Sequence, residues 1–132
     1  MTAVFADTSA LYAVLTESDD NHTRAAQAFA RLQTRQSALV STSYVLVETY
    51  ALVGRRLGLD AVRRFRTEFA PLLEIVWVDE AMHNAALDLL LGRRTRQLSL
   101  VNAVSFLTMQ RRGLSEAFAF DPHFEKEGFV LI

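Results

Sequence analysis

Short apolar runs alternate with longer segments of helical periodicity along almost the whole chain. The runs predict strands at 4–6, 38–40, 75–78, 117–120 and 129–132, and the periodic segments predict helices at 8–15, 22–35, 43–57, 60–70, 80–91 and 100–112. Such strands, alternating with helices, indicate a three-layer α/β/α sandwich around a central, mainly parallel sheet of about five short strands. The loops after parallel strands meet at one edge of the sheet, where polar ligands bind.

Length and composition indicate a single globular domain over residues 1–132. Hydrophobic residues make up 51% of the chain and charged residues 22%, which is ordinary for a domain with a substantial core. Cysteine is absent, so disulfides and thiolate metal sites are excluded and a reducing compartment is favoured. We find neither a signal-peptide pattern nor an apolar stretch of the roughly 20 residues that a membrane span needs. We expect a cytoplasmic protein.

Three carboxylates are predicted to converge at that edge of the sheet. Asp7 and Asp121 each end an apolar strand just before a helix, although Asp is also a favoured helix N-cap and capping alone is an alternative. Glu48 is the only charged residue in 43-SYVLVETYALV-53. A glutamate in such a place is rarely buried unless it is paired, and Tyr44, one turn earlier, is a candidate partner. Together the three carboxylates favour a functional site.

Asn102 is the polar exception in the apolar helix predicted at 100–112. An unpaired buried amide costs roughly 1–3 kcal/mol, so this side chain needs hydrogen-bond partners. Ser99 and Ser105 lie three residues to either side and extend it into a narrow polar seam. Carboxylates gathered beside that seam would repel one another unless a divalent cation neutralised them. Hard oxygen ligands without cysteine or a histidine cluster favour Mg²⁺ or Mn²⁺ over zinc.

At these positions the chain resembles the PIN-domain nucleases, most closely the VapC-type toxins of bacterial VapBC toxin–antitoxin modules. The resemblance is carried by Asp7-Thr8-Ser9, 45-VLVETYALV-53, 98-LSLVNAVSFLTM-109 and 117-AFAFDPHFEKEGF-129. Each motif is weak alone, but the set is specific in this order and spacing. It implies one PIN-like domain over residues 1–132 and a catalytic set of Asp7, Glu48, residue 102 and Asp121, with Ser9 as a supporting hydroxyl.

The resemblance further implies a toxin that hydrolyses RNA phosphodiesters with Mg²⁺ or Mn²⁺. Asp7, Asn102 and Asp121 are the expected metal ligands, and Glu48 is expected to hold a metal-bound water or a second ion. Position 102 is an aspartate in the family pattern, so Asn102 retains one oxygen and removes a charge. We therefore expect this chain to be attenuated or inactive. Two origins stay open: a deliberate inactivating substitution, which we favour because an active toxin poisons its expression host, and a natural variant.

Arginine supplies thirteen of the fourteen basic residues, and most of them are clustered. Arg suits bidentate phosphate contacts better than Lys does. Arg93, Arg94 and Arg96 precede the Asn102 helix and are the first candidates for RNA contact, although such a cluster is equally compatible with a solvated loop. His123 is a weaker candidate, because a lone surface histidine is usually without function.

Apolar side chains on the helices exceed what a small domain needs inside, among them Phe29, Leu32, Phe65, Phe69, Met82 and Leu90. This surplus predicts a homodimer and an exposed apolar groove near the early helices, which the resemblance assigns to a cognate VapB-type antitoxin. The alternative to a nuclease is a non-catalytic PIN protein that docks RNA or an antitoxin. A nucleotide-binding domain is disfavoured, because no Gly-rich loop follows any strand. A phosphate-receiver domain is disfavoured too.

Overall fold

Five parallel strands form the central sheet of the computed structural model, which describes residues 2–132. In spatial order they are β3 (Leu73–Val76), β2 (Ala38–Thr42), β1 (Ala3–Ala6), β4 (Glu116–Phe118) and β5 (Val130–Leu131). At the centre, Phe5 of β1 lies between Val40 of β2 and Ala117 of β4, and all four strand pairings are parallel. The predicted sheet is confirmed.

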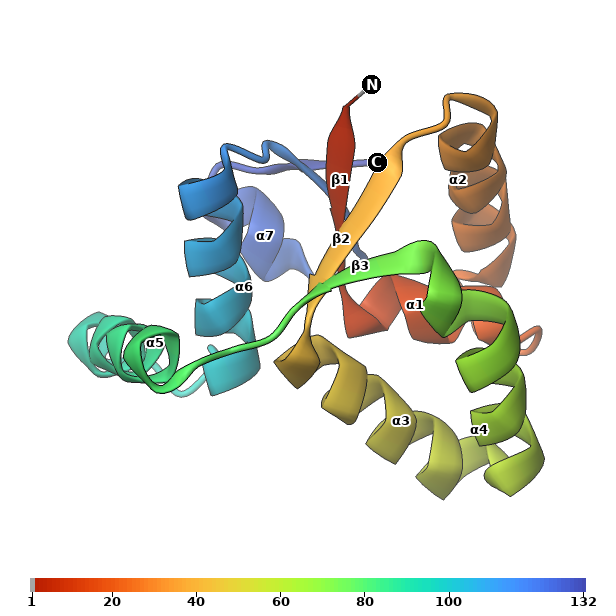
Figure 1. Ribbon diagram of the computed structural model, residues 1–132, viewed down its shortest axis with the longest axis horizontal. Helices are drawn as coiled ribbons and strands as arrows, with labels where there is room; N and C mark the ends of the chain where they lie inside the picture. Colours follow the sequence, from red (N-terminus) through yellow and green to blue (C-terminus); the bar gives the residue numbers. More distant parts are fainter. Residues whose placement is uncertain (1) are drawn as a thin grey trace.

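Helices cover both faces of this sheet, so the predicted three-layer sandwich is also confirmed. They are α1 (Thr8–Leu15), α2 (His22–Thr34), α3 (Ser43–Leu57), α4 (Leu59–Arg64), α5 (Glu80–Arg93), α6 (Leu100–Arg112) and α7 (Pro122–Lys126). Figure 1 shows α1 and α2 on one side of the sheet and α6 and α7 on the other. Within residues 2–132 no helix combines the length and apolar character needed to cross a membrane.

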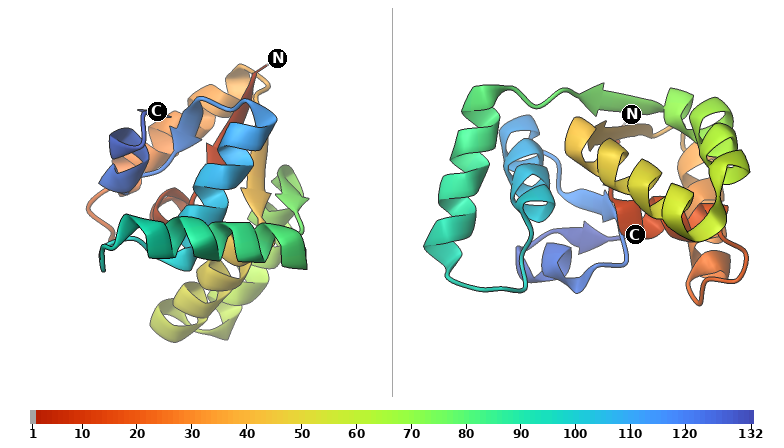
Figure 2. Two further views of the ribbon diagram at one scale, coloured as in Figure 1. Left: turned by 90° about the vertical axis from the view of Figure 1, so that its left-hand side faces the viewer. Right: turned by 90° about the horizontal axis from the view of Figure 1, so that it is seen from below.

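The main hydrophobic core lies around β1, where Val4, Phe5 and Ala6 are fully buried. Aromatic rings fill the space on the α6 side, and the centroids of Phe106 and Phe124 are 5.1 Å apart. A smaller core, centred on Ala86, Ala103 and Val104, joins α5 to α6. Figure 2 shows α5 beside α6 at the margin of the molecule, away from the main core.

The six apolar side chains that we considered surplus are not free surface groups, and this part of the reasoning was wrong. Leu32 and Phe65 are buried, and Phe29 and Phe69 pack against the main core. Met82 and Leu90 pack against the smaller core, because α5 needs its own apolar partners. The large exposed apolar side chains are others, led by Trp77, Leu59, Val47 and Leu91.

Several predicted elements differ in their limits from the observed ones, and two of these differences have a clear physical cause or consequence. β3 begins and ends two residues earlier than predicted, which leaves Trp77 73% exposed beyond its end. The helix predicted from residue 60 to Pro71 starts as α4 but continues as a π-helical turn, η1 (Phe65–Phe69), and a 3₁₀ turn, η2 (Ala70–Leu72). Pro71 has no backbone N–H to donate, so an α-helix cannot continue through it unbroken.

Candidate active site

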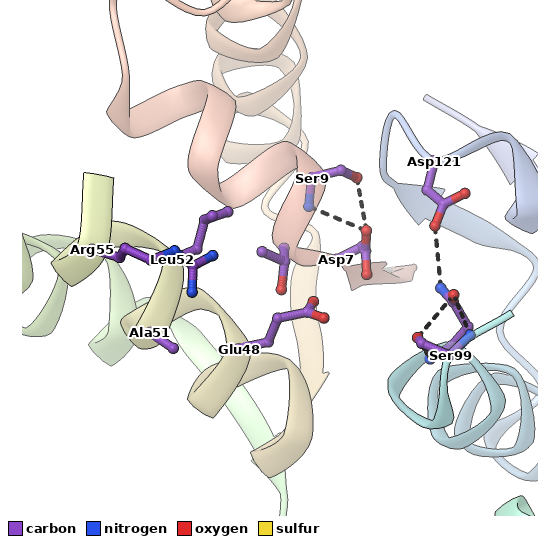
Figure 3. A pocket seen from close by; sticks show the side chains of 10 residues that line it. Asp7, Ser9, Glu48, Ala51, Leu52, Arg55, Ser99 and Asp121 are labelled. Carbon is purple, nitrogen blue, oxygen red and sulfur yellow. Dashed lines mark hydrogen bonds between the residues drawn. The ribbon is translucent and has the colours of Figure 1, made fainter. Parts of the chain in front are cut away.

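A cavity of about 390 Å³ lies beyond the ends of β1 and β4, between α3 and the start of α6. Figure 1 shows this end of β1 at the lower edge of the sheet. The cavity is lined by Asp7, Thr8, Ser9, Glu48, Ala51, Leu52, Arg55, Ser99, Asn102 and Asp121 (Figure 3). Five of these side chains form the catalytic set that the sequence predicts. The fold therefore brings that whole set to one place, although its chemical roles stay predictions.

Asp7 is the most deeply placed carboxylate of the cavity and is only 5% exposed. It directly follows β1, and its backbone N–H donates to the carbonyl of Phe118 at 3.1 Å. Its Oδ2 accepts from Ser9 N at 3.1 Å and from Ser9 Oγ at 2.7 Å, so it also caps α1. Burial raises the pKa of Asp7 from 3.8 to about 6, with the Glu48 and Asp121 carboxylates adding to the rise and the Ser9 hydrogen bonds opposing it.

Hydroxyl groups fix the first turn of α1 against its neighbours. Ser9 Oγ accepts from Phe120 N at 2.9 Å, which ties α1 to the end of β4. Thr8 Oγ1 lies 3.0 Å from Thr49 Oγ1 and 3.3 Å from the Val45 carbonyl, which ties α1 to α3. Neither threonine was among the predicted site residues. A signal was present, because Thr8 follows Asp7 and Thr49 follows Glu48.

Glu48 projects from α3, and Figure 3 shows its carboxylate turned towards Asp7. The candidate partner Tyr44 does not hold it, because the Tyr44 hydroxyl hydrogen-bonds to Nδ1 of His83. That structural alternative for Glu48 was wrong. Arg55 lies two helical turns further along α3 and lines the same cavity.

Asn102 is 8% exposed, and both the nitrogen and the oxygen of its amide form hydrogen bonds. Its Nδ2 donates to Asp121 Oδ2 at 3.2 Å, while its Oδ1 accepts from Ser99 N at 3.2 Å and from Ser99 Oγ at 3.0 Å. Ser99 Oγ accepts from Asn102 N in return, which completes a capping box at the start of α6. The predicted polar seam ends there, because Ser105 is buried and donates to the Val101 carbonyl of its own helix.

Asp121 closes the cavity on the far side from Glu48 and caps the short helix α7. Its Oδ1 accepts from His123 N at 2.9 Å and lies 2.7 Å from His123 Nδ1. His123 is therefore a half-buried partner of Asp121 and not the lone surface histidine that the sequence suggested. Asp7 and Asp121 therefore each cap a helix and also line the cavity, so the capping alternative does not keep them out of it.

The predicted RNA-binding arginines lie outside this cavity. Arg93 forms an ion pair with Glu127, which raises the pKa of Arg93 and lowers that of Glu127 through their hydrogen bond. Arg93 lines a second cavity of about 220 Å³ together with His123 and Lys126, whereas Arg94 and Arg96 line neither cavity. Their contact with RNA stays a prediction.

Comparison with known proteins adds independent information. A family model described as the PIN domain matches residues 4–129, which is nearly the whole chain. The chain belongs to the PIN-domain family. This PIN domain is 30% identical over 128 residues to the 23S rRNA-specific endonuclease VapC20 of Mycobacterium tuberculosis, an alignment that covers 96% of this chain and 95% of VapC20.

Comparison with solved structures agrees with this assignment. The crystal structure of M. tuberculosis VapC20, described as a sarcin–ricin-loop-cleaving toxin, matches with a TM-score of 0.84 and 28% identity over 97% of both chains. DNA-bound VapBC from Salmonella typhimurium and FitAcB from Neisseria gonorrhoeae each match with a TM-score of 0.70 at 14% identity, over 100% and 98% of this chain and 98% and 96% of theirs. These two show the fold, and VapC20 confirms the predicted VapC-type resemblance.

The donor set of this PIN domain fits a hydrated Mg²⁺ or Mn²⁺ ion better than an ion closely surrounded by protein ligands. Among residues 2–132, no three acidic or histidine side chains stand close enough together to hold a metal ion by themselves. Mg²⁺ keeps several waters and usually needs only one or two carboxylates from the protein. Burial raises the pKa of Asp7, so a cation beside this carboxylate would offset the cost of its ionisation.

Proposed function

We propose that this PIN domain is a metal-dependent endoribonuclease toxin of a type II toxin–antitoxin module, attenuated or inactive in this chain because of Asn102. The observation that carries the proposal is the convergence of Asp7, Glu48 and Asp121 on one cavity. VapC20 supplies the substrate to test first, because it is named as specific for 23S rRNA and as cleaving the sarcin–ricin loop. An activity on ribosomal RNA would place the protein in the cytoplasm.

The position of each carboxylate in the cavity indicates its role in the proposed hydrolysis. Asp7, the most buried of the three, would hold the metal ion together with Asp121, and Glu48 would hold a metal-bound water or a second ion. When bound, Mg²⁺ or Mn²⁺ supplies Lewis-acid stabilisation of the phosphate charge and lowers the pKa of water. Ser9 fixes the oxygen of Asp7 that faces α1 and leaves the other oxygen for the ion.

Asn102 places a hydrogen-bond donor where the family pattern has a negatively charged aspartate. Its Nδ2–H group faces Asp121 and partly neutralises that carboxylate, as a metal ion otherwise would. Its Oδ1 is occupied by Ser99, so Asn102 contributes no free oxygen to the cavity. The predicted role of Asn102 as a metal ligand would require this amide to turn.

Metal affinity is the first test of the proposal. Calorimetric titration of Mg²⁺ or Mn²⁺ should show binding to this chain that becomes about tenfold tighter or more in Asn102→Asp, because a carboxylate replaces a neutral donor. Asp79→Asn is the matched control, since Asp79 caps α5 and does not line the cavity, and it should leave the affinity unchanged. Equal affinities in this chain and Asn102→Asp would favour the non-catalytic docking function.

An antitoxin is the protein partner that we propose. A hollow of about 340 Å³ lies beside the end of α2, lined by Phe29, Leu32, Gln33, Gln36, Ser37, Leu39 and Leu72. We propose that this hollow is the apolar groove expected near the early helices and that a VapB-type segment occupies it. Two of the proteins with the same fold are VapBC and FitAcB. The homodimer stays a proposal, with Val47, Trp77 and Leu91 as its exposed apolar side chains.

Salt-dependent RNA binding tests the arginine loop. Replacing Arg93, Arg94 and Arg96 together by Gln should weaken RNA binding and flatten its salt dependence, by about one in log–log slope for each phosphate interaction that the substitution removes. Because Arg93 is already paired with Glu127, we expect a slope change nearer two than three. Fluorescence anisotropy at a series of salt concentrations measures both quantities. An unchanged slope would remove this loop from the RNA interface.

A further inference from the structure

Arg55 is the only basic side chain among those that line the carboxylate cavity. It belongs to the same face of α3 as Glu48, because Glu48, Leu52 and Arg55 follow one another at helical spacing. Figure 3 shows the carboxylates of Asp7 and Glu48 at one end of the cavity and Arg55 at the other, beyond Leu52. The cavity therefore has an acidic end and a cationic end.

Neutralising the carboxylates is not what Arg55 does. The ion pairs among residues 2–132 involve other arginines or His123, and none joins Arg55 to a carboxylate within 4.0 Å. Its neighbour Arg56 is engaged differently, with its guanidinium 5.5 Å from the centre of the Tyr12 ring. Arg55 thus presents a guanidinium to an anion that enters the cavity.

We propose that Arg55 binds a backbone phosphate of the RNA strand next to the cleaved one and so sets how the strand lies across the cavity. The planar guanidinium donates two parallel hydrogen bonds to two phosphate oxygens, which a lysine ammonium cannot reproduce. Ala51 and Leu52, between Arg55 and Glu48, give the strand an uncharged path towards the carboxylates. The inference rests on the proposed function, because it assumes an RNA substrate.

The test compares two adjacent arginines that carry the same charge. Binding of a sarcin–ricin-loop RNA hairpin to this chain is measured by anisotropy in EDTA over a series of salt concentrations. Arg55→Gln should weaken binding by about tenfold and lower the log–log salt slope by about one, while Arg56→Gln should change the affinity less than about twofold. Arg55→Lys should keep the slope but recover only part of the affinity, because the bidentate geometry is lost.

Two outcomes would overturn the proposal. Equal losses in Arg55→Gln and Arg56→Gln would show general surface charge only, and an unchanged affinity in Arg55→Gln would rule out the phosphate interaction. Thermal melting of each variant checks the fold, which an exposed side chain should not alter.

Cleavage assays in the Asn102→Asp background separate this inference from the proposed function. If Asn102→Asp is inert with both metals while Arg55→Gln still weakens RNA binding selectively, the nuclease function fails and the phosphate contact stands. If Asn102→Asp cleaves RNA and adding Arg55→Gln leaves KM and kcat unchanged, the Arg55 contact fails and the nuclease function stands.

Discussion

Asn102→Asp should raise the rate of Mg²⁺- or Mn²⁺-dependent RNA cleavage by at least about a hundredfold over this chain. A carboxylate at position 102 adds a charged oxygen ligand, and errors of about 1 Å in the placement of reacting groups cost on the order of a hundredfold. Initial rates on a 23S rRNA sarcin–ricin hairpin and on total RNA, with each metal and with EDTA, measure the effect. Growth arrest of an expression host should return together with the activity.

Two controls test whether the cleavage regained in Asn102→Asp comes from the proposed site. Adding Asp7→Ala to Asn102→Asp should silence cleavage again. Without metal, Asn102→Asp should also be less stable than this chain by roughly 1–3 kcal/mol, because a hydrogen bond of 3.2 Å to Asp121 becomes a repulsion between carboxylates. Mg²⁺ should reverse that destabilisation in a thermal melt. A folded Asn102→Asp protein that stays inert with both metals on both RNAs would contradict the nuclease proposal.

Asp7→Asn should stabilise the metal-free protein at neutral pH by about 2–3 kcal/mol while it abolishes any cleavage. The pKa of Asp7 rises from 3.8 to about 6 on folding, so the folded state holds its proton more tightly than the unfolded chain. Stability falls as the pH rises between these two values, because the folded protein must then ionise a buried carboxylate. Asparagine removes this cost and still accepts the Ser9 N–H hydrogen bond that caps α1.

The pH dependence of the stability gained in Asp7→Asn distinguishes the removal of a buried charge from a change in packing. Urea denaturation in EDTA between pH 4 and pH 8 should show the advantage of Asp7→Asn growing as the pH rises towards about 6, and levelling off above it. At pH 4 the two proteins should be nearly equal. Asp79→Asn replaces an exposed capping aspartate and reports the effect of the cap alone. A gain that is independent of pH would contradict the burial argument.

Strand number and order of elements could be predicted from the sequence because each short apolar run is bounded by a polar or turn residue. The limits of β3 could not, because 72-LLEIVWV-78 offers apolar residues on both sides of the true strand. Pairing with β2 decides the register, since Leu73 lies opposite Leu39 and Val76 opposite Thr42. The π-helical turn at Phe65–Phe69 has no local sequence signal that we recognise.

Site residues at strand ends could be predicted because the topology alone places them together, as it does for Asp7 and Asp121. Arg55 was visible only as one member of an arginine cluster, and its spacing of seven residues from Glu48 was the signal that we did not use. Arg93, unlike Arg55, forms an ion pair with a carboxylate. Nothing local in the sequence reveals that Arg93 meets Glu127, which is 34 residues away along the chain.

Side chains that line the cavity also accept hydrogen bonds at the starts of helices. This double role limits which substitutions can remove the carboxylates and still leave the domain folded. Asp7 and Asp121 each accept the backbone N–H that starts a helix, and position 102 accepts the N–H of Ser99. Alanine at position 7 or 121 would remove a charge and a cap together, at roughly 0.5–2 kcal/mol for the cap. Asparagine removes the charge alone. Asparagine is therefore the substitution that removes the carboxylate and keeps the helix start intact, and a single base change converts it back to aspartate.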